Sequence, residues 1–284
     1  MSKFLKRAKE LNLKAKTTVF SEYVGSHISK KKGEGYDFSE IKEYTYGDDI
    51  RHMDWTISAK LGSPHIKLFN EENKLFIEVI SLLNGSCYFG SVRQKQDLIA
   101  EIVGTILYSG FKKKDIIKST LAHNHIVYES PIVKRASAIE KEIENILQFQ
   151  SLGKIVDLKE IGKRVIEKTK RKSLIILVGD FLDGFEKAAP PNLSYLAKKH
   201  EVIAIVVRDK IEETLGEISF GSFVDPVNKK SLETSLSKQT KMRYKERLRE
   251  YDKKLFTHFH KLKIISKKIY TDDSVGKELR KVFR

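Results

Sequence analysis

The sequence has 284 residues, of which 40% are hydrophobic, and a formal net charge of +16. It is long enough for one large unit with a buried core and a smaller appendage. Its apolar runs stay below the roughly 20 residues of a membrane span, and residues 1–16 lack the apolar stretch of a secretory signal. One cysteine, Cys87, excludes an internal disulfide framework. We therefore expect a protein of the reducing cytoplasm.

Residues 1–73 differ in pattern from the rest of the chain. They begin with alternating basic and apolar residues and continue through a stretch that contains several glycines. No long helical pattern follows the basic start. We predict a basic N-terminal helix and a β-rich appendage over residues 1–73, and a main domain over residues 74–284.

The main domain alternates apolar strand patterns with helical patterns. The predicted strands are 74–83, 115–122, 125–129, 173–183, 201–207 and 263–271, with a small hairpin at 216–230. The predicted helices are 96–113, 137–149, 157–170, 193–200, 238–261 and a closing helix from Asp273. Nearly continuous apolar strands separated by helices are typical of a mostly parallel sheet covered on both faces, which is an α/β fold.

The positive charge lies at the two ends of the sequence. Residues 1–35 carry nine basic and three acidic residues, and residues 238–284 carry sixteen basic and six acidic residues. Solvated helix faces are the simplest explanation, and an acidic partner or an anionic membrane surface is the alternative. Nucleic acid is disfavoured as a partner, because a nucleic-acid reader usually places its charge beside stacking aromatics or on a recognition helix.

Polar residues follow two of the predicted strands. Asn84, Ser86 and Tyr88 follow the first strand of the main domain, and Asp180 follows a later one. Ligands bind at the carboxyl ends of the strands in open parallel sheets. The arrangement resembles a von Willebrand factor A-type fold. In that fold Asp-x-Ser-x-Ser after the first strand, a Thr from an intervening loop and an Asp after a later strand hold a divalent ion.

The resemblance at these positions is incomplete. Asn84 stands in place of the first Asp, Tyr88 in place of the second Ser, and Val156 near the position of the Thr, whereas Ser86 and Asp180 are kept. One carboxylate offsets little of the cost of dehydrating Mg²⁺. We therefore expect no cofactor, with Mg²⁺ as a weak alternative. Asp180 and Ser86 are instead expected to cap the segments that follow their strands.

A dense polar motif, YGDDIRHMDW, occupies residues 46–55. With its flanks it resembles the bacterial domain-of-unknown-function family fifty-eight, in which such a segment introduces an A-type domain. Lys42 and Lys60 stand at two positions where that family usually has arginine. The matching residues are Gly33, Gly35, Phe38, Tyr44, Gly47, Asp48, Asp49, Arg51, Asp54, Trp55 and Ala59.

The motif can be interpreted from its residue types. Gly47 and the aspartates are typical of a turn, and Arg51 is placed to form a fork with Asp54 or Asp49. Trp55 is expected to anchor the appendage on apolar surface. A structural clamp is the favoured interpretation, and a surface that contacts a partner is the alternative. A catalytic cluster is disfavoured because the motif lies away from the expected strand ends.

The family resemblance implies a non-enzymatic protein-interaction module. It implies an adaptor or co-chaperone that works with a MoxR-type AAA+ ATPase in the maturation of protein complexes, some of them membrane-linked. The alternative is a basic protein that binds nucleic acid or the anionic surface of a membrane. No Gly-x-x-x-x-Gly-Lys-Ser/Thr or Gly-x-Ser-x-Gly motif occurs, and no histidine near Cys87 in the sequence marks a base. We therefore expect no enzymatic activity.

Overall fold

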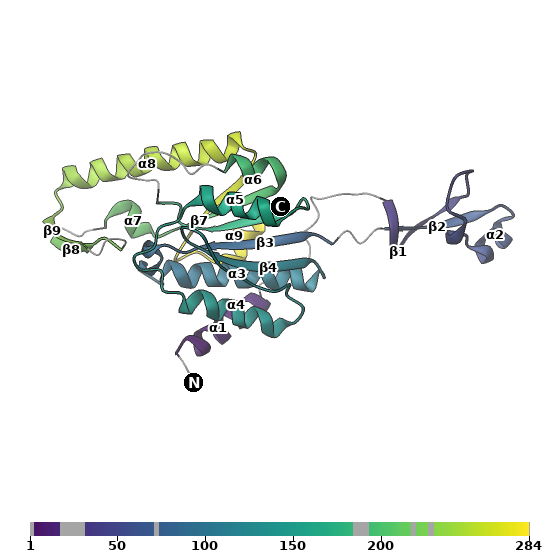
Figure 1. The fold of residues 1–284 in the computed structure, drawn as a ribbon, viewed down its shortest axis with the longest axis horizontal. Helices are drawn as coiled ribbons and strands as arrows, with labels where there is room; N and C mark the ends of the chain where they lie inside the picture. Colours follow the sequence, from purple (N-terminus) through teal and green to yellow (C-terminus); the bar gives the residue numbers. More distant parts are fainter. Residues whose placement is uncertain are drawn as a thin grey trace. The chain divides into compact units, whose positions relative to one another are not determined.

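The chain divides into two compact units (Figure 1). The larger unit comprises Met1–Val24 and Leu75–Arg284, and the smaller unit comprises Gly25–Lys74. The computed structural model describes residues 3–17, 32–70, 74–183, 193–216, 220–226 and 230–283.

The elements of each unit have the following bounds. The strands of the larger unit are β3 (Phe76–Leu82), β4 (Ile116–Ala122), β5 (Ile126–Glu129), β6 (Leu174–Gly179), β7 (Glu201–Arg208), β8 (Phe220–Val224), β9 (Ser231–Ser235) and β10 (Ile265–Tyr270). Its helices are α1 (Lys3–Thr17), η2 (Gly85–Tyr88), α3 (Lys95–Lys112), α4 (Ala136–Gln148), α5 (Leu158–Lys168), α6 (Ser194–Lys199), α7 (Lys210–Thr214), α8 (Lys238–Lys261) and α9 (Val275–Val282). The smaller unit contains β1 (Lys32–Glu43), η1 (Ile50–His52), α2 (Trp55–Leu61) and β2 (His65–Asn70).

Six strands of the larger unit form one sheet in the order β10-β7-β6-β3-β4-β5. β5 runs antiparallel to β4, and the other neighbours are parallel. The chain starts at the centre with β3, builds outward through β4 and β5, and then adds β6, β7 and β10 on the other side. This confirms the predicted α/β class with a von Willebrand factor A-like sheet. The change of direction between β3 and β6 makes their carboxyl ends the expected ligand-binding edge.

Helices cover both faces of this sheet (Figure 1). On one face α3 packs against the strands, and α1 and α4 pack on α3. On the other face α5, α6 and α8 contribute Leu158, Leu196 and Phe259 to a buried apolar cluster with the strands. Because both faces are covered, β3 and β6 are almost wholly buried, which explains their continuous apolar sequences. A hairpin is present as the antiparallel pair β8 and β9. Only β8 lies within the predicted range 216–230, and β9 follows directly after it.

The basic N-terminal helix α1 belongs to the larger unit. Ala8, Leu11 and Ala15 form a buried stripe at helical spacing. Arg7 of α1 donates to Asp97 of α3 at 3.2 Å. The sequence prediction grouped this helix with the appendage instead, because its charges stood out more clearly than its short apolar stripe.

The smaller unit is built on the antiparallel pair β1 and β2, as expected for a β-rich appendage. Between these strands the chain forms η1 and then α2. Asp54 caps the start of α2, and Gly62 ends it with a φ of 75°, a left-handed conformation that favours glycine.

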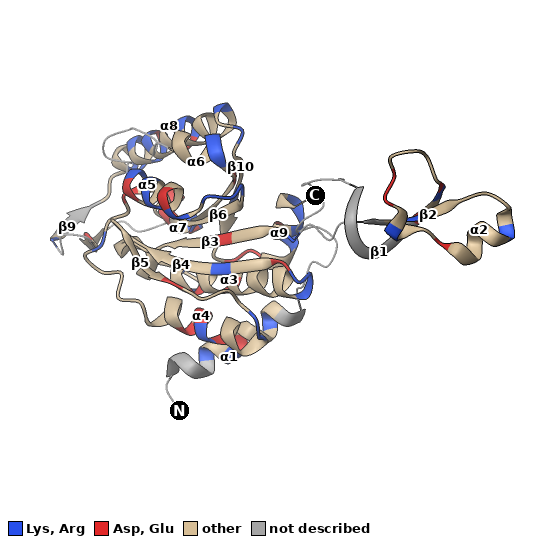
Figure 2. Ribbon diagram, turned by 45° about the vertical axis from the view of Figure 1, so that its right-hand side comes forward, with Lys and Arg blue, Asp and Glu red and all other residues tan. Residues whose placement is uncertain are grey.

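Lys and Arg residues are spread along α8, as the blue parts of its ribbon show (Figure 2). The exposed ones are Lys238, Arg243, Lys245, Arg247, Arg249, Lys253, Lys254 and Lys261. The exposed acidic residues of the same helix are Glu246 and Glu250, so the outer surface of α8 is strongly positive. Among the helices that the structure describes, none has both the length and the apolar composition needed to cross a membrane.

Asp115 provides a test of how burial affects stability in the larger unit. Its Oδ1 accepts a hydrogen bond from the Leu75 amide at 3.1 Å, while its Oδ2 has no hydrogen-bond partner among the described residues. Burial raises the pKa of Asp115 to about 6. The folded state then holds a proton more tightly than the unfolded chain, so stability falls as the pH rises from about 4 to about 6.

We expect Asp115→Asn to remove this pH-dependent loss. At pH 7 the variant should be more stable than the wild type by about 1 kcal/mol, after allowance for partial exposure to solvent. The gain should vanish below pH 4, where both side chains are neutral. Urea unfolding at pH 4 and pH 7 measures the effect. A variant that is less stable than the wild type at pH 7 would contradict the assignment.

Candidate functional site

The candidate site lies at the carboxyl ends of β3 and β6. Asn84 follows β3 and Asp180 follows β6, and both residues are buried. The Nδ2 of Asn84 donates to Asp180 Oδ1 at 2.9 Å and to Asp183 Oδ2 at 2.9 Å. The amide therefore joins two carboxylates that would otherwise repel each other.

Ser86 and Asp180 are in direct contact. The Ser86 hydroxyl donates to Asp180 Oδ2 and lies 2.9 Å from Asn84 Oδ1. Asp180 Oδ1 accepts the Leu182 amide at 3.1 Å, which is the turn cap expected of this residue. Ser86 does not cap the segment after β3. Its hydroxyl is used within the site instead.

The other two positions singled out by the A-type resemblance contribute no oxygen to the site. Tyr88 directs its hydroxyl to Gln150, whose Oε1 lies 3.1 Å away. Val156 is apolar and packs against the buried cluster under α5. Asn84, Ser86 and Asp180 are thus brought together. Tyr88 and the side chain of Val156 are not part of the cluster, although the Val156 backbone hydrogen-bonds Asp183.

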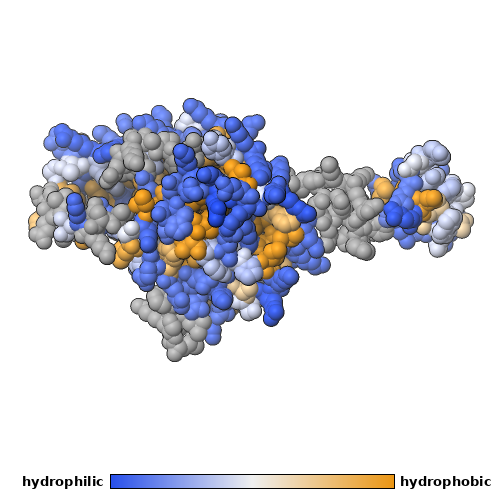
Figure 3. Space-filling view, in the orientation of Figure 1, coloured by the Kyte–Doolittle hydropathy of each residue, from blue (hydrophilic) through white to orange (hydrophobic). Residues whose placement is uncertain are grey.

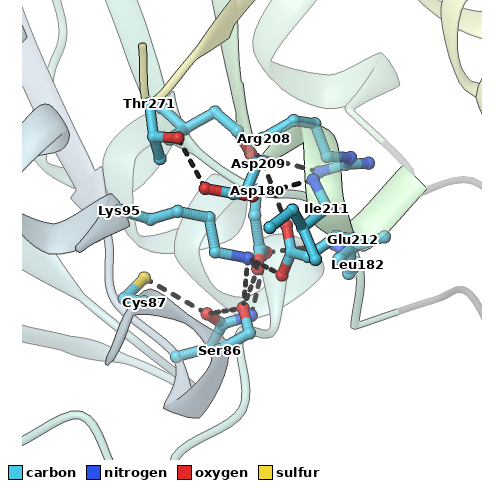
Figure 4. Close-up of polar contacts among 12 residues, drawn as sticks. Ser86, Cys87, Lys95, Asp180, Leu182, Arg208, Asp209, Ile211, Glu212 and Thr271 are labelled. Atoms are coloured by element: carbon cyan, nitrogen blue, oxygen red, sulfur yellow. Dashed lines mark hydrogen bonds and ion pairs between the residues drawn. The ribbon is translucent and has the colours of Figure 1, made fainter. Parts of the chain in front are cut away.

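Lys95, the first residue of α3, reaches into the centre of this cluster (Figure 4). Its Nζ lies 3.2 Å from Asp180 Oδ2, 2.5 Å from Glu212 Oε1 and 3.3 Å from Ser86 Oγ. Lys95 is 0% exposed. Glu212 comes from α7, so the ammonium links the ends of β3 and β6 to the segment that follows β7.

The electrostatics of the site favour an ionised pair. Burial opposes the charged form of Lys95, but the negative charges of Asp180 and Glu212 outweigh burial and raise the pKa of the ammonium. Burial also opposes the carboxylate of Asp180, yet the charges of Lys95 and then Arg208 lower its pKa. By contrast, desolvation and the nearby charge of Asp180 raise the pKa of Asp183 to about 7.

A second charge network adjoins the first. The Nη2 of Arg208 lies 3.2 Å from Asp252 Oδ1, and Lys268 Nζ lies 2.6 Å from both Asp252 Oδ2 and Glu213 Oε1. Arg208 is fully buried at the end of β7. Because Glu213 neighbours Glu212, alternating charges run from α3 through α7 to α8 and β10. Breaking one member of such a buried network is expected to leave its partners uncompensated.

The residues at the strand ends do not fit a divalent cation. Such an ion needs several hard oxygen ligands and enough negative charge to offset its dehydration. Here the ammonium of Lys95 contacts the two oxygens, of Ser86 and Asp180, that match the A-type ion site. Among the described residues, no group of three or more His, Cys, Asp or Glu is arranged to hold a metal ion.

Cys87 is not placed to act as a nucleophile. The thiol is fully buried, and its Sγ lies 3.3 Å from Asn84 Oδ1. Burial, and then the charge of Asp180, raise the pKa of the thiol. The reactive thiolate is therefore disfavoured at neutral pH.

The polar motif of the smaller unit forms a series of local clamps. Asp48 accepts from the Thr45 amide at 2.8 Å and from Lys42 Nζ at 3.0 Å. Arg51 forms its fork with Asp49, with Nη2 at 2.6 Å and Nε at 3.0 Å from Oδ2. Asp54, the other predicted partner of Arg51, caps helix α2 instead.

Asp54 fixes the beginning of α2. Its Oδ1 accepts the amides of Thr56 at 3.0 Å and Ile57 at 3.1 Å, and Lys67 Nζ lies 2.8 Å from its Oδ2. Gly47 has a φ of 104°, so the turn before these residues requires glycine. The motif thus holds a turn and a helix start in a defined geometry.

Trp55 is not buried within its own unit, and its role in anchoring the appendage on apolar surface stays a prediction. Its side chain is 73% exposed, although it is the first residue of the capped helix α2. Tyr46, Ile50 and Leu61 are large side chains of the same unit that are also mostly exposed. The motif therefore presents apolar side chains outward on a frame that is held by hydrogen bonds.

A hollow of about 280 Å³ lies elsewhere in the larger unit, at the beginnings of β3 and β4. Figure 3 shows apolar surface among the polar surface near the beginning of β3. Glu78 lines the hollow, but its Oε1 is 3.0 Å from Lys118 Nζ and accepts from Thr120 at 2.7 Å. The carboxylate of Glu78 is therefore already satisfied within the fold.

Sequence reasoning missed Lys95 and Glu212. Lys95 lies beyond the strand-end residues, and Glu212 lies 117 positions further along the chain. One weak signal was present in the sequence, namely a lysine next to the start of a predicted helix. A cation in the first turn of a helix is disfavoured by the helix dipole, so a nearby negative charge is expected to compensate it. In the folded chain, the carboxylates of Asp180 and Glu212 supply this compensating charge to Lys95.

The solved structures that match this chain are distant from it in sequence and in structure. A conserved hypothetical protein, BatB, from Bacteroides thetaiotaomicron is 11% identical with a TM-score of 0.42, covering 73% of this chain and 98% of that one. An aerotolerance-related membrane protein from Bacteroides fragilis is 7% identical with a TM-score of 0.44, covering 73% of this chain and 96% of that one.

Sequence relatives give a more specific result. Uncharacterized proteins of Mycobacterium bovis and Mycobacterium tuberculosis are each 23% identical over 197 residues, which is 68% of this chain and 62% of theirs. The chain thus spans less than two thirds of the length of these relatives. The family described as protein of unknown function DUF58 matches residues 40–254. Because this match covers well over half of the sequence and includes both the polar motif and the strand-end site, the chain belongs to the DUF58 family.

Proposed function

We propose that this protein is a non-enzymatic interaction module. It serves as an adaptor or co-chaperone of a MoxR-type AAA+ ATPase in the maturation of protein complexes, some of them membrane-linked. It works in the cytoplasm, including at the inner face of the membrane. The observation that carries the proposal is the exposure of Trp55 on a frame held by Asp54 and its neighbours.

The exposed side chains of the smaller unit suit a protein partner. Aromatic residues are enriched among the residues that dominate binding at interfaces. Trp55 and Tyr46 are exposed, while Asp48, Asp49 and Asp54 hold the backbone that carries them. A surface that is already ordered loses less conformational freedom on binding. In this proposal the aspartates of the motif hold the backbone, and the exposed aromatic residues of the same motif contact the partner.

The strand-end site supports the non-enzymatic part of the proposal. The carboxylates of Asp180 and Glu212 are both paired with Lys95. Cys87 is buried with a raised pKa. A general base or a nucleophile has to be able to change its charge state near neutral pH. The lowered pKa of Asp180 and the raised pKa of Cys87 oppose such a change at these two groups.

Capture from the source cells tests the proposal. The tagged full chain is used at low and moderate salt, and the bound proteins are identified. We expect a MoxR-type AAA+ ATPase to be retained at moderate salt by the wild type and to fall at least about fivefold with Trp55→Ser, since a central aromatic contact is worth 1 kcal/mol or more. Tyr195→Ser is the matched control, because Tyr195 is a 60% exposed aromatic residue in the larger unit.

The exposed basic surface of α8 favours a second candidate function, attachment to an anionic membrane surface. Each basic residue near such a surface contributes about 1 kcal/mol at low salt. The same capture experiment, repeated with a charge-reversed variant, separates the two candidate functions. The variant reverses the charges of Lys241, Arg243, Arg247 and Arg249. Loss of bound lipid with rising salt and on charge reversal would favour the second candidate. Retention of the ATPase by the reversed variant, together with its loss in Trp55→Ser, favours the first.

A further inference from the structure

We propose that the ammonium of Lys95 is a built-in cation that takes the place of the divalent ion of A-type strand-end sites, so that this site is complete without a metal. The proposal concerns the larger unit alone and does not depend on the identity of any partner. It is carried by the contacts, the burial and the charge balance of Lys95.

The contacts of Lys95 match those of an ion at this position. An ammonium has three hydrogen-bond donors, and Nζ has three oxygen neighbours, Asp180 Oδ2, Glu212 Oε1 and Ser86 Oγ, at 3.2, 2.5 and 3.3 Å. Ser86 and Asp180 are the two residues that this chain keeps from the A-type ion site. Figure 4 shows the ammonium between them. All three donors of the cation are therefore accounted for by oxygens of the fold.

The charge balance explains why Asn84 accompanies Lys95. Replacing a divalent ion by an ammonium removes one positive charge. Replacing the usual Asp by Asn84 removes one negative charge, so the two differences compensate. The amide of Asn84 then donates at 2.9 Å to Asp180, where an Asp would add a third carboxylate beside Asp180 and Asp183. Asn84 and Lys95 together therefore keep the net charge of the site the same as with an Asp and a divalent ion.

The neighbours of Lys95 hold it in place. Its backbone amide donates to the Phe89 carbonyl at 2.9 Å, and the next side chain, Gln96, donates to the carbonyls of Ile146 at 2.6 Å and Phe149 at 2.9 Å. Lys95 is completely buried, so it cannot swing out to admit an ion without disturbing the start of α3. The cation is thus a fixed part of the fold.

The proposal predicts that removing the ammonium creates a metal site. The test uses Mn²⁺, which prefers oxygen ligands, and measures binding to the purified full chain by isothermal titration and electron paramagnetic resonance. The variant Lys95→Ala/Asn84→Asp opens space and restores the carboxylate. We expect it to bind Mn²⁺ at least about tenfold more tightly than the wild type, which should show no saturable binding up to about 1 mM.

A volume-matched control separates lost charge from gained space. Lys95→Met/Asn84→Asp also lacks the ammonium, but the methionine fills the position, so it should bind Mn²⁺ no better than the wild type. If the alanine variant is unfolded without metal, added Mn²⁺ should restore its cooperative thermal transition, and the methionine variant should show no such recovery. Absence of both binding and recovery in the alanine variant would overturn the proposal. Saturable Mn²⁺ binding by the wild type that is lost in Asp180→Asn would overturn it as well.

Discussion

Replacing Lys95 by methionine is expected to lower the free energy of unfolding by about 3–5 kcal/mol at pH 7, the usual cost of leaving a buried charge without its partner. Asp180 and Glu212 would lose the ammonium that lies 3.2 and 2.5 Å from them. Urea unfolding followed by far-ultraviolet circular dichroism measures the loss. Tryptophan fluorescence is unsuitable, because Trp55 is the only tryptophan and lies in the smaller unit.

The dependence on pH separates this mechanism from simple loss of packing. The pKa of Asp180 is lowered in the folded state. The stability that it contributes is therefore present above its unfolded pKa of about 4 and is lost as the pH falls through the lower folded value. Wild type and Lys95→Met should converge as the pH falls.

A double variant gives the control for this prediction. In Lys95→Met/Asp180→Asn the buried carboxylate is neutral as well, so the second substitution should cost less in the Lys95→Met background than in the wild type. Equal costs in the two backgrounds would show that the two side chains are not coupled. A loss below about 1 kcal/mol for Lys95→Met alone would mean that the carboxylates find solvent or other donors.

The larger fold could be predicted from the sequence because its strands are unusually apolar. β6 is buried at all six positions, and a run of this kind between two helical patterns leaves few alternatives to a covered parallel strand. The packing of α1 could not be predicted. Its stripe of Ala8, Leu11 and Ala15 is short, and its contacts are with α3 and α4, far along the chain.

The candidate site could be predicted in its position but not in its chemistry. Strand ends in an open sheet converge whatever side chains they carry, so Asn84 and Asp180 could be placed together. The group between them comes from a helix start, and its second partner, Glu212, comes from a short helix after β7. The exposure of Trp55 within its own unit could not be predicted, because large apolar residues are usually buried.

The coupling of Asn84 and Lys95 makes the converse substitution informative. We expect Asn84→Asp alone, with Lys95 intact, to destabilise the fold by about 2–4 kcal/mol at pH 8, because it places a further carboxylate beside Asp180 and Asp183 in a buried cluster that also holds Glu212. The pKa of Asp183 is already raised to about 7, and a further charge would raise the pKa values of the cluster again.

The sign of the pH dependence is what tests this substitution. Carboxyls with raised pKa values bind protons more tightly in the folded state, so the deficit of Asn84→Asp should grow as the pH rises from about 4 to beyond 7. Urea unfolding at pH 5 and pH 8 measures it. Asn84→Leu is the control, since it removes the donor without adding charge and should show a smaller change between the two pH values. A deficit of Asn84→Asp that is the same at both would mean that the amide is needed for its hydrogen bonds alone, and that the charge balance with Lys95 does not govern the choice of residue at this strand end.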